Sequence, residues 1–221
     1  MERFLLSKNH MLNRSIDKKK LEKILEEVPG FRKPSKRFEQ YITPSRIVSE
    51  IIIQALLRGD LEGVIADLGC GTGRISLAAG LAGGSRILCI DISCDDLKTA
   101  WDVFKKFNID DAIDIICWDL MKDLELKVDT VIMNPPFGVY RRGYDMIFLE
   151  RAWSIARRSI YSIHKYNKRS LELIARRALN RGFDTMILDI LDIEIPAIFH
   201  THRRRIYRFK VAVIYMKRRY S

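Results

Sequence analysis

The sequence of 221 residues lacks the features that mark membrane and secreted proteins. A helix that spans a bilayer needs roughly 20 consecutive apolar residues, and the best candidate here, residues 51–53, is soon followed by Gln54 and Arg58. The first residues do not contain the cleavable apolar core of a signal peptide. We therefore expect a cytoplasmic protein that has no membrane as a partner.

Metal-binding cysteine patterns are also missing. The four cysteines are Cys70, Cys89, Cys94 and Cys117, and no two of them have the C-x-x-C spacing of a zinc knuckle. We expect all four to be reduced thiols that pack as small hydrophobic side chains. The sequence therefore predicts no metal site.

The net charge of +11 is distributed unevenly along the chain. Residues 1–60 carry +5, residues 61–138 carry −6 and residues 139–221 carry +12. Basic segments on both sides of an acidic centre indicate a polyanionic partner such as RNA or DNA. A solvated, heat-adapted surface explains the same excess, so charge alone leaves both interpretations open.

The composition, with 48% hydrophobic and 30% charged residues, is typical of a globular protein. From residue 64 onward, short apolar runs alternate with amphipathic segments, which is typical of strands joined by helical crossovers. We predict an α/β fold with a seven-stranded, mainly parallel sheet and helices on both faces. The strands are expected at 64–68, 86–91, 113–118, 130–133, 159–163, 184–193 and 206–216, and the helices between them at 75–81, 95–107, 145–158 and 171–180.

Two more helices are expected before this alternation begins. Ser15 can cap the first, with Asp17 in its first turn, and Pro29-Gly30 ends it. Pro44 suits the first position of the second helix. We divide the chain into an N-terminal extension with one helix, residues 1–30, and a single domain, residues 31–221.

A glycine-rich segment, DLGCGTG at residues 67–73, lies between the first predicted strand and a helix. Its glycines let the backbone turn sharply and pass close to a ligand. Dinucleotide sites have the spacing G-x-G-x-x-G and hold a pyrophosphate, whereas the spacing here is G-x-G-x-G. Asp67 would repel a phosphate and attract the cationic groups of S-adenosylmethionine. A tight structural turn is the alternative.

Acidic residues also follow the second and third predicted strands. Asp91 can accept hydrogen bonds from both ribose hydroxyls of an adenosyl group, although it could equally cap the next helix. Asp119 can accept from the adenine amino group, with Leu120 against the ring. Because the carboxyl ends of parallel strands meet at one edge of a sheet, these acids and the glycine-rich segment predict one pocket.

The segment Asn134-Pro135-Pro136-Phe137 follows the fourth predicted strand. Prolines have no backbone N–H, so the carbonyls here are free to accept from another group. Asn134 and the Pro135 carbonyl can together accept from a planar amine, which aims the nitrogen lone pair at an incoming methyl group. Phe137 can stack on the ring that carries the amine. Catalysis would depend on orientation and electrostatics without a strong general base.

These four motifs, in this order, resemble those of class I S-adenosylmethionine-dependent methyltransferases that modify adenine N6, cytosine N4 or a glutamine amide. The segments FEQYITP at 38–44, VIMNPPFG at 131–138, DMIFL at 145–149 and YSIHK at 161–165, with IPA at 195–197 and the His/Arg run after it, resemble the methyltransferase-like protein 5 family and its archaeal relatives. The resemblance covers about residues 36–215. The first 30 residues match no part of it.

The resemblance implies a Rossmann-like class I methyltransferase that methylates adenine N6 in small-subunit ribosomal RNA. In eukaryotes this family works as a heterodimer with a small zinc-binding activator subunit. The implied cofactor-binding residues are Gln40, Tyr41, Thr43, Asp67, Gly69, Thr72, Gly73, Arg74, Asp91, Asp119 and Leu120. Two departures are modest: Ile42 stands where a proline is frequent, and the end of the glycine-rich loop differs.

Partner surfaces are expected at two places. Ile113, Ile115 and Ile116 lie in a strand that would be a sheet edge, where the activator would dock; burial on both faces is the alternative. RNA-backbone contacts are expected from a basic set near the pocket and in the tail, with a solvated face as the alternative. This set comprises Lys165, His202, Arg203, Arg204 and Arg205. His164, next to Lys165, is either a substrate contact or a structural histidine.

Other functions fit parts of the pattern. A protein-glutamine N5 methyltransferase of release factors would share the Asn134 motif, but it usually has a larger helical N-terminal domain. A DNA adenine methyltransferase normally adds a target-recognition domain. An RNA-binding assembly factor without turnover is disfavoured by the intact Asn134 motif and cofactor loop.

Overall fold

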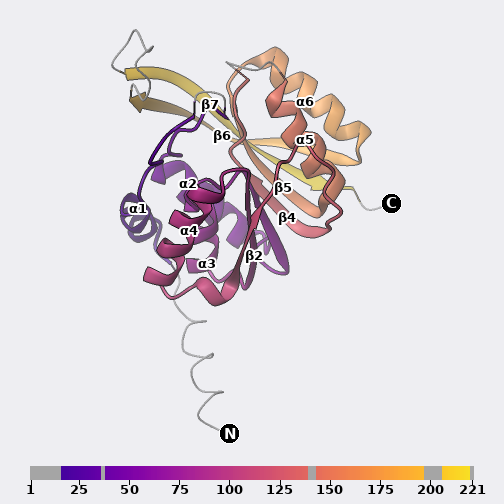
Figure 1. Cartoon of the computed structure of the whole chain (residues 1–221). Helices are drawn as coiled ribbons and strands as arrows, with labels where there is room; N and C mark the ends of the chain where they lie inside the picture. Colours follow the sequence, from indigo (N-terminus) through magenta and orange to yellow (C-terminus); the bar gives the residue numbers. More distant parts are fainter. Residues whose placement is uncertain (1–15, 36–37, 139–142, 197–205, 220–221) are drawn as a thin grey trace, which may run out of the picture.

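A seven-stranded sheet runs through the computed structural model, which describes residues 16–35, 38–138, 143–196 and 206–219 (Figure 1). Its strand order is β3-β2-β1-β4-β5-β7-β6. The first five strands are parallel, and β7 is antiparallel to both β5 and β6. This confirms the predicted fold class. The strands are β1 Val64–Leu68, β2 Arg86–Asp91, β3 Ile113–Cys117, β4 Val128–Met133, β5 Ala156–Lys165, β6 Phe183–Pro196 and β7 Ile206–Arg218.

Helices cover both faces of the sheet, because alternate residues of each strand point to opposite sides. Ile132 packs with α1 to α4, whereas its neighbours Val131 and Met133 pack with α5 and α6. All three side chains are fully buried. The helices are α1 Lys18–Glu26, α2 Ser45–Leu57, α3 Arg74–Leu81, α4 Cys94–Lys106, α5 Tyr144–Ile155 and α6 Lys168–Asn180, and a short 3-10 helix, η3, spans Asp110–Ala112.

Several predicted boundaries differ from the observed ones. Helix α5 ends at Ile155 and β5 begins at Ala156, inside the segment predicted to be helical, because Ala156 pairs with Val128 of β4. Pro44 is the N-cap of α2 and not its first helical residue. Asp17 is the N-cap of α1, and its carboxylate accepts from the Lys20 N–H at 3.3 Å. The predicted cap, Ser15, lies outside the described residues.

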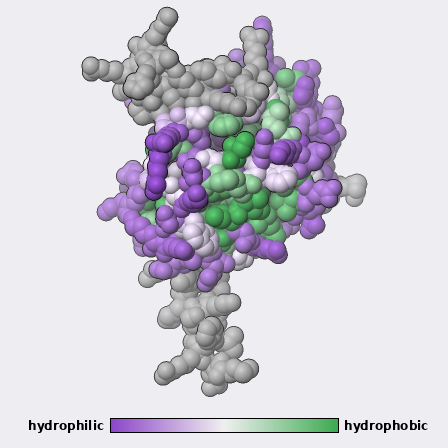
Figure 2. Space-filling model, in the orientation of Figure 1, coloured by the Kyte–Doolittle hydropathy of each residue, from purple (hydrophilic) through white to green (hydrophobic). Residues whose placement is uncertain are grey.

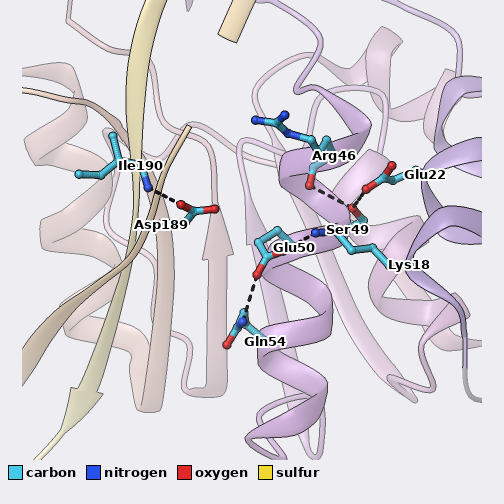
Figure 3. Close-up of polar contacts among 8 residues, drawn as sticks. All are labelled: Lys18, Glu22, Arg46, Ser49, Glu50, Gln54, Asp189 and Ile190. Atoms are coloured by element: carbon cyan, nitrogen blue, oxygen red, sulfur yellow. Dashed lines mark hydrogen bonds and ion pairs between the residues drawn. The ribbon is translucent and has the colours of Figure 1, made fainter. Parts of the chain in front are cut away.

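Helix α1 packs against α2 and shares the core of the sheet. Leu21 and Leu25 are fully buried in the same hydrophobic cluster as the residues of β1 and β2. Polar contacts surround this packing in Figure 3, where Lys18 forms an ion pair with Glu50 and Ser49 Oγ donates to Glu22 at 2.9 Å. The apolar core therefore runs without a break from the predicted extension into the domain.

The cysteine prediction is wrong for two of the four residues. Cys94 and Cys117 form a disulfide, with their Cα atoms 5.3 Å apart, while Cys70 and Cys89 are free and buried. Cys94 begins α4 directly after β2, and Cys117 ends β3, which pairs with β2. Adjacent parallel strands therefore bring together residues that are 23 positions apart in the sequence.

The β6–β7 hairpin extends beyond the end of β5. Lys165, the last residue of β5, pairs with Val211, whereas β7 begins five residues earlier at Ile206 and β6 continues to Pro196. In Figure 1 this hairpin leaves the sheet at the upper left. It projects beyond Leu191 and Val211. A register shift between Ile187 and Asp189 comes just before this part, and there the Asp189 carboxylate accepts from the Ile190 N–H at 2.7 Å (Figure 3). The projecting part lies on the side where the parallel strands have their carboxyl ends.

Two kinds of feature are absent from the described ranges. No helix there has the length and apolar character needed to cross a membrane. No group of three or more His, Cys, Asp or Glu side chains in those ranges is arranged to hold a metal ion.

Candidate active site

A cavity of about 970 Å³, measured out to its open mouth, lies where β1, β2, β3 and β4 end. Most residues predicted to bind the cofactor contribute to its wall. These are Gln40, Tyr41, Thr43, Gly69, Thr72, Arg74, Asp91, Asp119 and Leu120, together with Asn134 and Pro136 of the fourth motif. Asp67, Gly73, Pro135 and Phe137 are not part of this wall.

The glycine-rich loop has the conformation that its composition allows. Gly69, Gly71 and Gly73 all have positive φ, at 73°, 54° and 82°. A Cβ on Gly73 would lie 2.5 Å from Cζ of Phe104, so any side chain there would collide with the core under α4. The Gly69 N–H donates to the Ile90 carbonyl at 2.8 Å. These contacts hold the loop backbone against β2 and leave its outer side on the cavity.

Asp67 lies behind this loop and is 1% exposed. Its Oδ2 accepts from the backbone N–H and the hydroxyl of Ser76, at 3.0 and 2.7 Å. Its Oδ1 is buried without a partner among the described residues. Burial raises the pKa of Asp67 to about 7. The carboxyl therefore lies beneath the loop and is not part of the cavity wall.

Asp91 and Asp119 reach the cavity from neighbouring strand ends. Asp91 accepts from the Gly71 N–H at 2.9 Å and from the Ser93 N–H at 2.8 Å, while burial raises its pKa. Ser93, not Asp91, caps α4. Asp119 Oδ1 accepts from the Met121 N–H at 2.9 Å. Backbone donors thus hold both carboxylates in place at the cavity.

The segment before α2 forms the opposite wall of the cavity. Gln40 Nε2 donates to the Asp96 carboxylate at 2.9 Å, and Arg74 Nη1 donates to the Thr43 carbonyl at 3.0 Å. These bonds tie the segment to α4 and α3. Among the described residues, Arg74 Nε is buried without a hydrogen-bond partner, and burial lowers the pKa of the guanidinium. Phe31 also lines the wall, a residue that the sequence analysis did not single out.

Asn134 is held at both ends of its side-chain amide. Its Oδ1 accepts from Tyr41 Oη at 2.9 Å, and its Nδ2 donates to Thr43 Oγ1 at 2.9 Å. Phe137 lies between two other rings, with centroid distances of 5.4 Å to Tyr41 and 5.5 Å to Phe209. The fourth motif therefore contacts both the segment before α2 and the β6–β7 hairpin.

A second cavity, about 590 Å³ out to its mouth, begins on the other side of the motif, at Phe137. His164 lines it, is 3% exposed and has its Nε2 2.7 Å from Ser162 Oγ. Burial lowers the pKa of His164 to about 4, so the imidazole is neutral near pH 7. Lys165 Nζ lies 5.6 Å from the Phe209 ring centroid. The other lining residues are Asp145, Tyr166, Asn167, Ser170 and Ile174.

The second cavity was not predicted from the sequence, because its residues come from α5, β5, α6 and the loops that follow β4 and β5. Asp145 lies in the first turn of α5 and Asn167 caps α6, so their patterns indicate helix ends and nothing more. The predicted RNA contacts His202, Arg203, Arg204 and Arg205 lie outside the described residues. Of that predicted set, only Lys165 lies in the described part of the chain, where it lines this cavity.

Apolar side chains continue from the first cavity onto the surface. Trp118 and Met121 line the cavity and are 37% and 46% exposed. Ile115, in the edge strand β3, is 38% exposed, whereas Ile113 is buried. Figure 2 shows an apolar area ringed by hydrophilic residues near the centre of the face drawn. Strand β3 is therefore a sheet edge, as predicted, with one exposed apolar side chain.

The donor set of the first cavity fits S-adenosylmethionine. Asp91 and Asp119 bring carboxylates to its wall, and Arg74 is the one lysine or arginine among the described residues that line it. A carboxylate such as that of the methionine part would satisfy the unpaired Arg74 Nε. Carboxylates with apolar residues between them suit a cationic adenosyl ligand without phosphate groups.

The fold and this site are those of a class I methyltransferase, for which S-adenosylmethionine is the cofactor. Residues 47–154 match the family model described as "Methyltransferase small domain". The chain is 33% identical to the rRNA N(6)-adenosine-methyltransferase Mettl5 of Drosophila melanogaster over 194 residues, which cover 85% of this chain and 90% of that protein. The zebrafish (Danio rerio) METTL5 is 32% identical over 197 residues, covering 85% and 92%. This chain belongs to the methyltransferase-like protein 5 family.

A solved structure agrees with this assignment. The crystal structure of PH1948 from Pyrococcus horikoshii matches with a TM-score of 0.83 and 30% sequence identity. The match covers 93% of this chain and 98% of that chain. The fold is therefore shared over nearly the whole chain, including the β6–β7 side of the sheet.

Proposed function

We propose that this enzyme, an rRNA N6-adenosine methyltransferase by its family, acts on small-subunit ribosomal RNA through the amine clamp of Asn134. The main support for the clamp is the position of Asn134, which lines the cofactor cavity and has both ends of its side-chain amide hydrogen-bonded. The names of the fly and zebrafish relatives support the adenosine-N6 product. The choice of small-subunit RNA rests on the resemblance of the sequence motifs.

The clamp works by orienting a weakly basic nitrogen. Because Nδ2 of Asn134 donates to Thr43, the amide is held with its acceptor, Oδ1, turned toward Tyr41. This oxygen and the Pro135 carbonyl would accept from the two N–H groups of the adenine amine, which turns the nitrogen lone pair toward the cofactor cavity. Bound S-adenosylmethionine supplies an electrophilic methyl group on a sulfonium. The nitrogen becomes acidic as it is methylated, so its proton can leave to water without a strong general base.

The cofactor contacts are assigned along the cavity wall. Asp91 would accept from the ribose hydroxyls, and Asp119 with Leu120 would hold the adenine. The methionine part would lie against the loop backbone and Arg74, whose buried Nε lacks a partner. Asp67 would act through space from behind the loop. The remaining members of the proposed set, which hold the backbone or close the N-terminal side, are Gln40, Tyr41, Thr43, Gly69, Thr72 and Gly73.

RNA would approach across the second cavity. Lys165 lines it, and its Nζ lies 5.6 Å from the ring centroid of Phe209 on the projecting β6–β7 hairpin. The proposed RNA contacts also include His202, Arg203, Arg204 and Arg205, which lie outside the described residues. Arg208 and Lys210 on the same hairpin are paired with Glu194 and Asp192, at 2.7 and 2.9 Å. These exposed pairs are weak, so both cations can exchange their partners for phosphate oxygens.

A small zinc-binding activator subunit is proposed to dock on β3. Its edge has unpaired backbone groups, and Ile115 is exposed on it. If this is right, Ile115→Lys abolishes co-purification with an added activator, while Met186→Lys on the opposite edge strand β6 does not. Equal retention of the activator by both variants would contradict this docking site.

The test of the function is to identify the methylated product. The protein is incubated with labelled S-adenosylmethionine and small-subunit rRNA, with and without an activator, and the RNA is digested to nucleosides. We expect labelled N6-methyladenosine, and a loss of about 100-fold or more in Asn134→Ala, because one oriented acceptor in such a site contributes that much. Cofactor binding by Asn134→Ala, measured by calorimetry, is the control for folding.

Two results would contradict the proposal. Wild-type turnover by Asn134→Ala would exclude the amine clamp. Label that appears in a glutamine of a release factor, and not in RNA, would favour a protein-glutamine N5 methyltransferase. That alternative rests on a shorter match, 31% identity over 91 residues to a release factor glutamine methyltransferase of Borreliella burgdorferi.

A further inference from the structure

Tyr41 makes the same two kinds of contact that the proposed clamp requires of its substrate. Its hydroxyl donates to Asn134 Oδ1 at 2.9 Å, the atom assigned to accept from the adenine amine. Its ring lies against Phe137, with centroids 5.4 Å apart and planes inclined by 31°. A bound adenine would make the same contacts, since its planar ring would lie against Phe137 and its amine would donate to Asn134.

The chemistry of the Tyr41 hydroxyl strengthens this likeness. Burial raises its pKa well above the ordinary value, so the group keeps its proton and remains a donor at all physiological pH values. Phe137 also has Phe209 against it, at 90° and 5.5 Å. In the RNA-free protein, Phe137 therefore already contacts two aromatic rings, those of Tyr41 and Phe209.

Tyr41 lies between the two cavities. Tyr41 and Asn134 line the cofactor cavity, whereas Phe137, which touches Tyr41, lines the second cavity. A base that enters through the second cavity meets Phe137 first and must then reach Asn134. The Tyr41 ring lies on that route.

We propose that Tyr41 occupies the place of the target adenine in the RNA-free protein and determines which groups can replace it. The proposal rests on the proposed function, because it takes the Asn134 oxygen as the acceptor for the amine. A base with an exocyclic amine restores both contacts when it displaces Tyr41. A base without any donor on that edge, such as unsubstituted purine, leaves the Asn134 oxygen without its donor and is rejected.

The neighbours of Tyr41 allow such an exchange without unfolding. Gln40 and Thr43 are tied to Asp96 and Arg74, so the segment is anchored on both sides of Tyr41. Tyr41 itself is held by one hydrogen bond in addition to its ring contacts. Rotation of this side chain opens the place beside Phe137 while the anchors stay.

The kinetic test uses Tyr41→Phe, which keeps the ring and removes the donor. A typical hydrogen bond changes an equilibrium about fivefold, so we expect the KM for RNA to fall about fivefold. We do not expect the variant to methylate bases that lack an exocyclic amine, since the clamp still needs an amine. Tyr161→Phe is the matched control, because Tyr161 donates to Asp60 at 2.7 Å and lines neither cavity. A tenfold lower kcat for Tyr41→Phe with an unchanged KM would make Tyr41 a positioning residue for Asn134 and overturn the proposal.

A second measurement does not depend on turnover. 3-Fluorotyrosine is placed at position 41, S-adenosylhomocysteine is added, and the ¹⁹F spectrum is followed as an rRNA oligonucleotide is titrated in. We expect the resonance to move to the position of an exposed tyrosine with the adenosine-containing oligonucleotide. The same oligonucleotide with purine riboside at every adenosine should leave it in place.

The outcomes separate this proposal from the proposed function. Methylated RNA with an unmoved ¹⁹F resonance at saturation overturns the role of Tyr41 and leaves the function intact. If only a glutamine-containing peptide is methylated and moves the resonance, the proposed methylation of RNA is wrong, while the displacement of Tyr41 by the substrate amine is supported. A resonance that moves with neither ligand overturns the displacement.

Discussion

Thr43 and Asn134 are joined by a hydrogen bond of 2.9 Å from Asn134 Nδ2 to Thr43 Oγ1, although they are 91 positions apart in the sequence. The bond fixes the orientation of the Asn134 amide, so that its Oδ1 faces Tyr41. It also connects the segment before α2 to the motif after β4. The geometry of the proposed clamp therefore depends on a residue far from the motif.

We expect Thr43→Val to lower the rate of methyl transfer about tenfold, because the loss of one partner of a part-buried amide costs about 1–3 kcal/mol. Single-turnover kinetics with saturating cofactor and RNA measure the effect. Thr43→Ser keeps the hydroxyl and should stay near the wild-type rate. Equal rates for the valine and serine variants would show that this bond does not orient Asn134.

The stability of the cofactor-free protein should depend on pH through Asp67. The pKa of this carboxyl is about 7 in the fold, against an ordinary value of 3.8. Between these values the unfolded chain has released the proton and the folded chain keeps it, so the free energy of unfolding falls as pH rises from about 4 to about 7 and then levels off.

Asp67→Asn removes this contribution. We expect the variant to gain stability relative to the wild type over that pH range, as measured by urea unfolding at steps between pH 4 and pH 8. Asp119→Asn, at an exposed strand end, is the comparison. A difference between Asp67→Asn and wild type that stays constant with pH would mean that the Asp67 carboxyl ionises normally in the fold.

The Cys94–Cys117 disulfide should stabilise both the fold and the cofactor cavity. Closing a loop of this length, 23 residues, contributes about 3 kcal/mol in the chain-entropy account. The bond also links the ends of β2 and β3, beside Asp91 and Asp119. We expect dithiothreitol to lower the melting temperature and to weaken cofactor binding severalfold.

Cys94→Ser is the control for this prediction. The variant should already show the lower melting temperature, and dithiothreitol should change it no further. A wild-type melting temperature that is insensitive to dithiothreitol would contradict a stabilising role of the disulfide. Cys70 and Cys89 are buried as free thiols and do not enter the comparison.

Lys165 should contribute one phosphate contact at the second cavity. Lys165→Ala is expected to weaken RNA binding and to reduce the slope of log K against log salt by about 0.7, the value for one phosphate of a single strand. Fluorescence anisotropy at several salt concentrations measures both quantities. Lys127→Ala, placed before β4 at the other end of the sheet, should leave the slope unchanged. The same slope for both variants would place the RNA elsewhere.

Local patterns were sufficient to predict most of the fold. The short apolar run of β4 identifies a buried strand, because a parallel strand that is covered on both faces is apolar at nearly every position. Gly69, Gly71 and Gly73 can adopt their positive φ values because glycine has no Cβ. The boundary at Ala156 could not be predicted, because Ala156 leaves a helix-like sequence only to pair with Val128.

The sequence by itself determined the class of the protein, since the order of strands, the glycine-rich loop and the Asn134 motif are all local. Only the tertiary structure decided which residues surround that motif. Tyr41 is 93 positions from Asn134, and the Cys94–Cys117 bond closes only because β2 and β3 lie side by side. Contacts of this kind depend on how the whole chain packs its core, and no short pattern in the sequence encodes them.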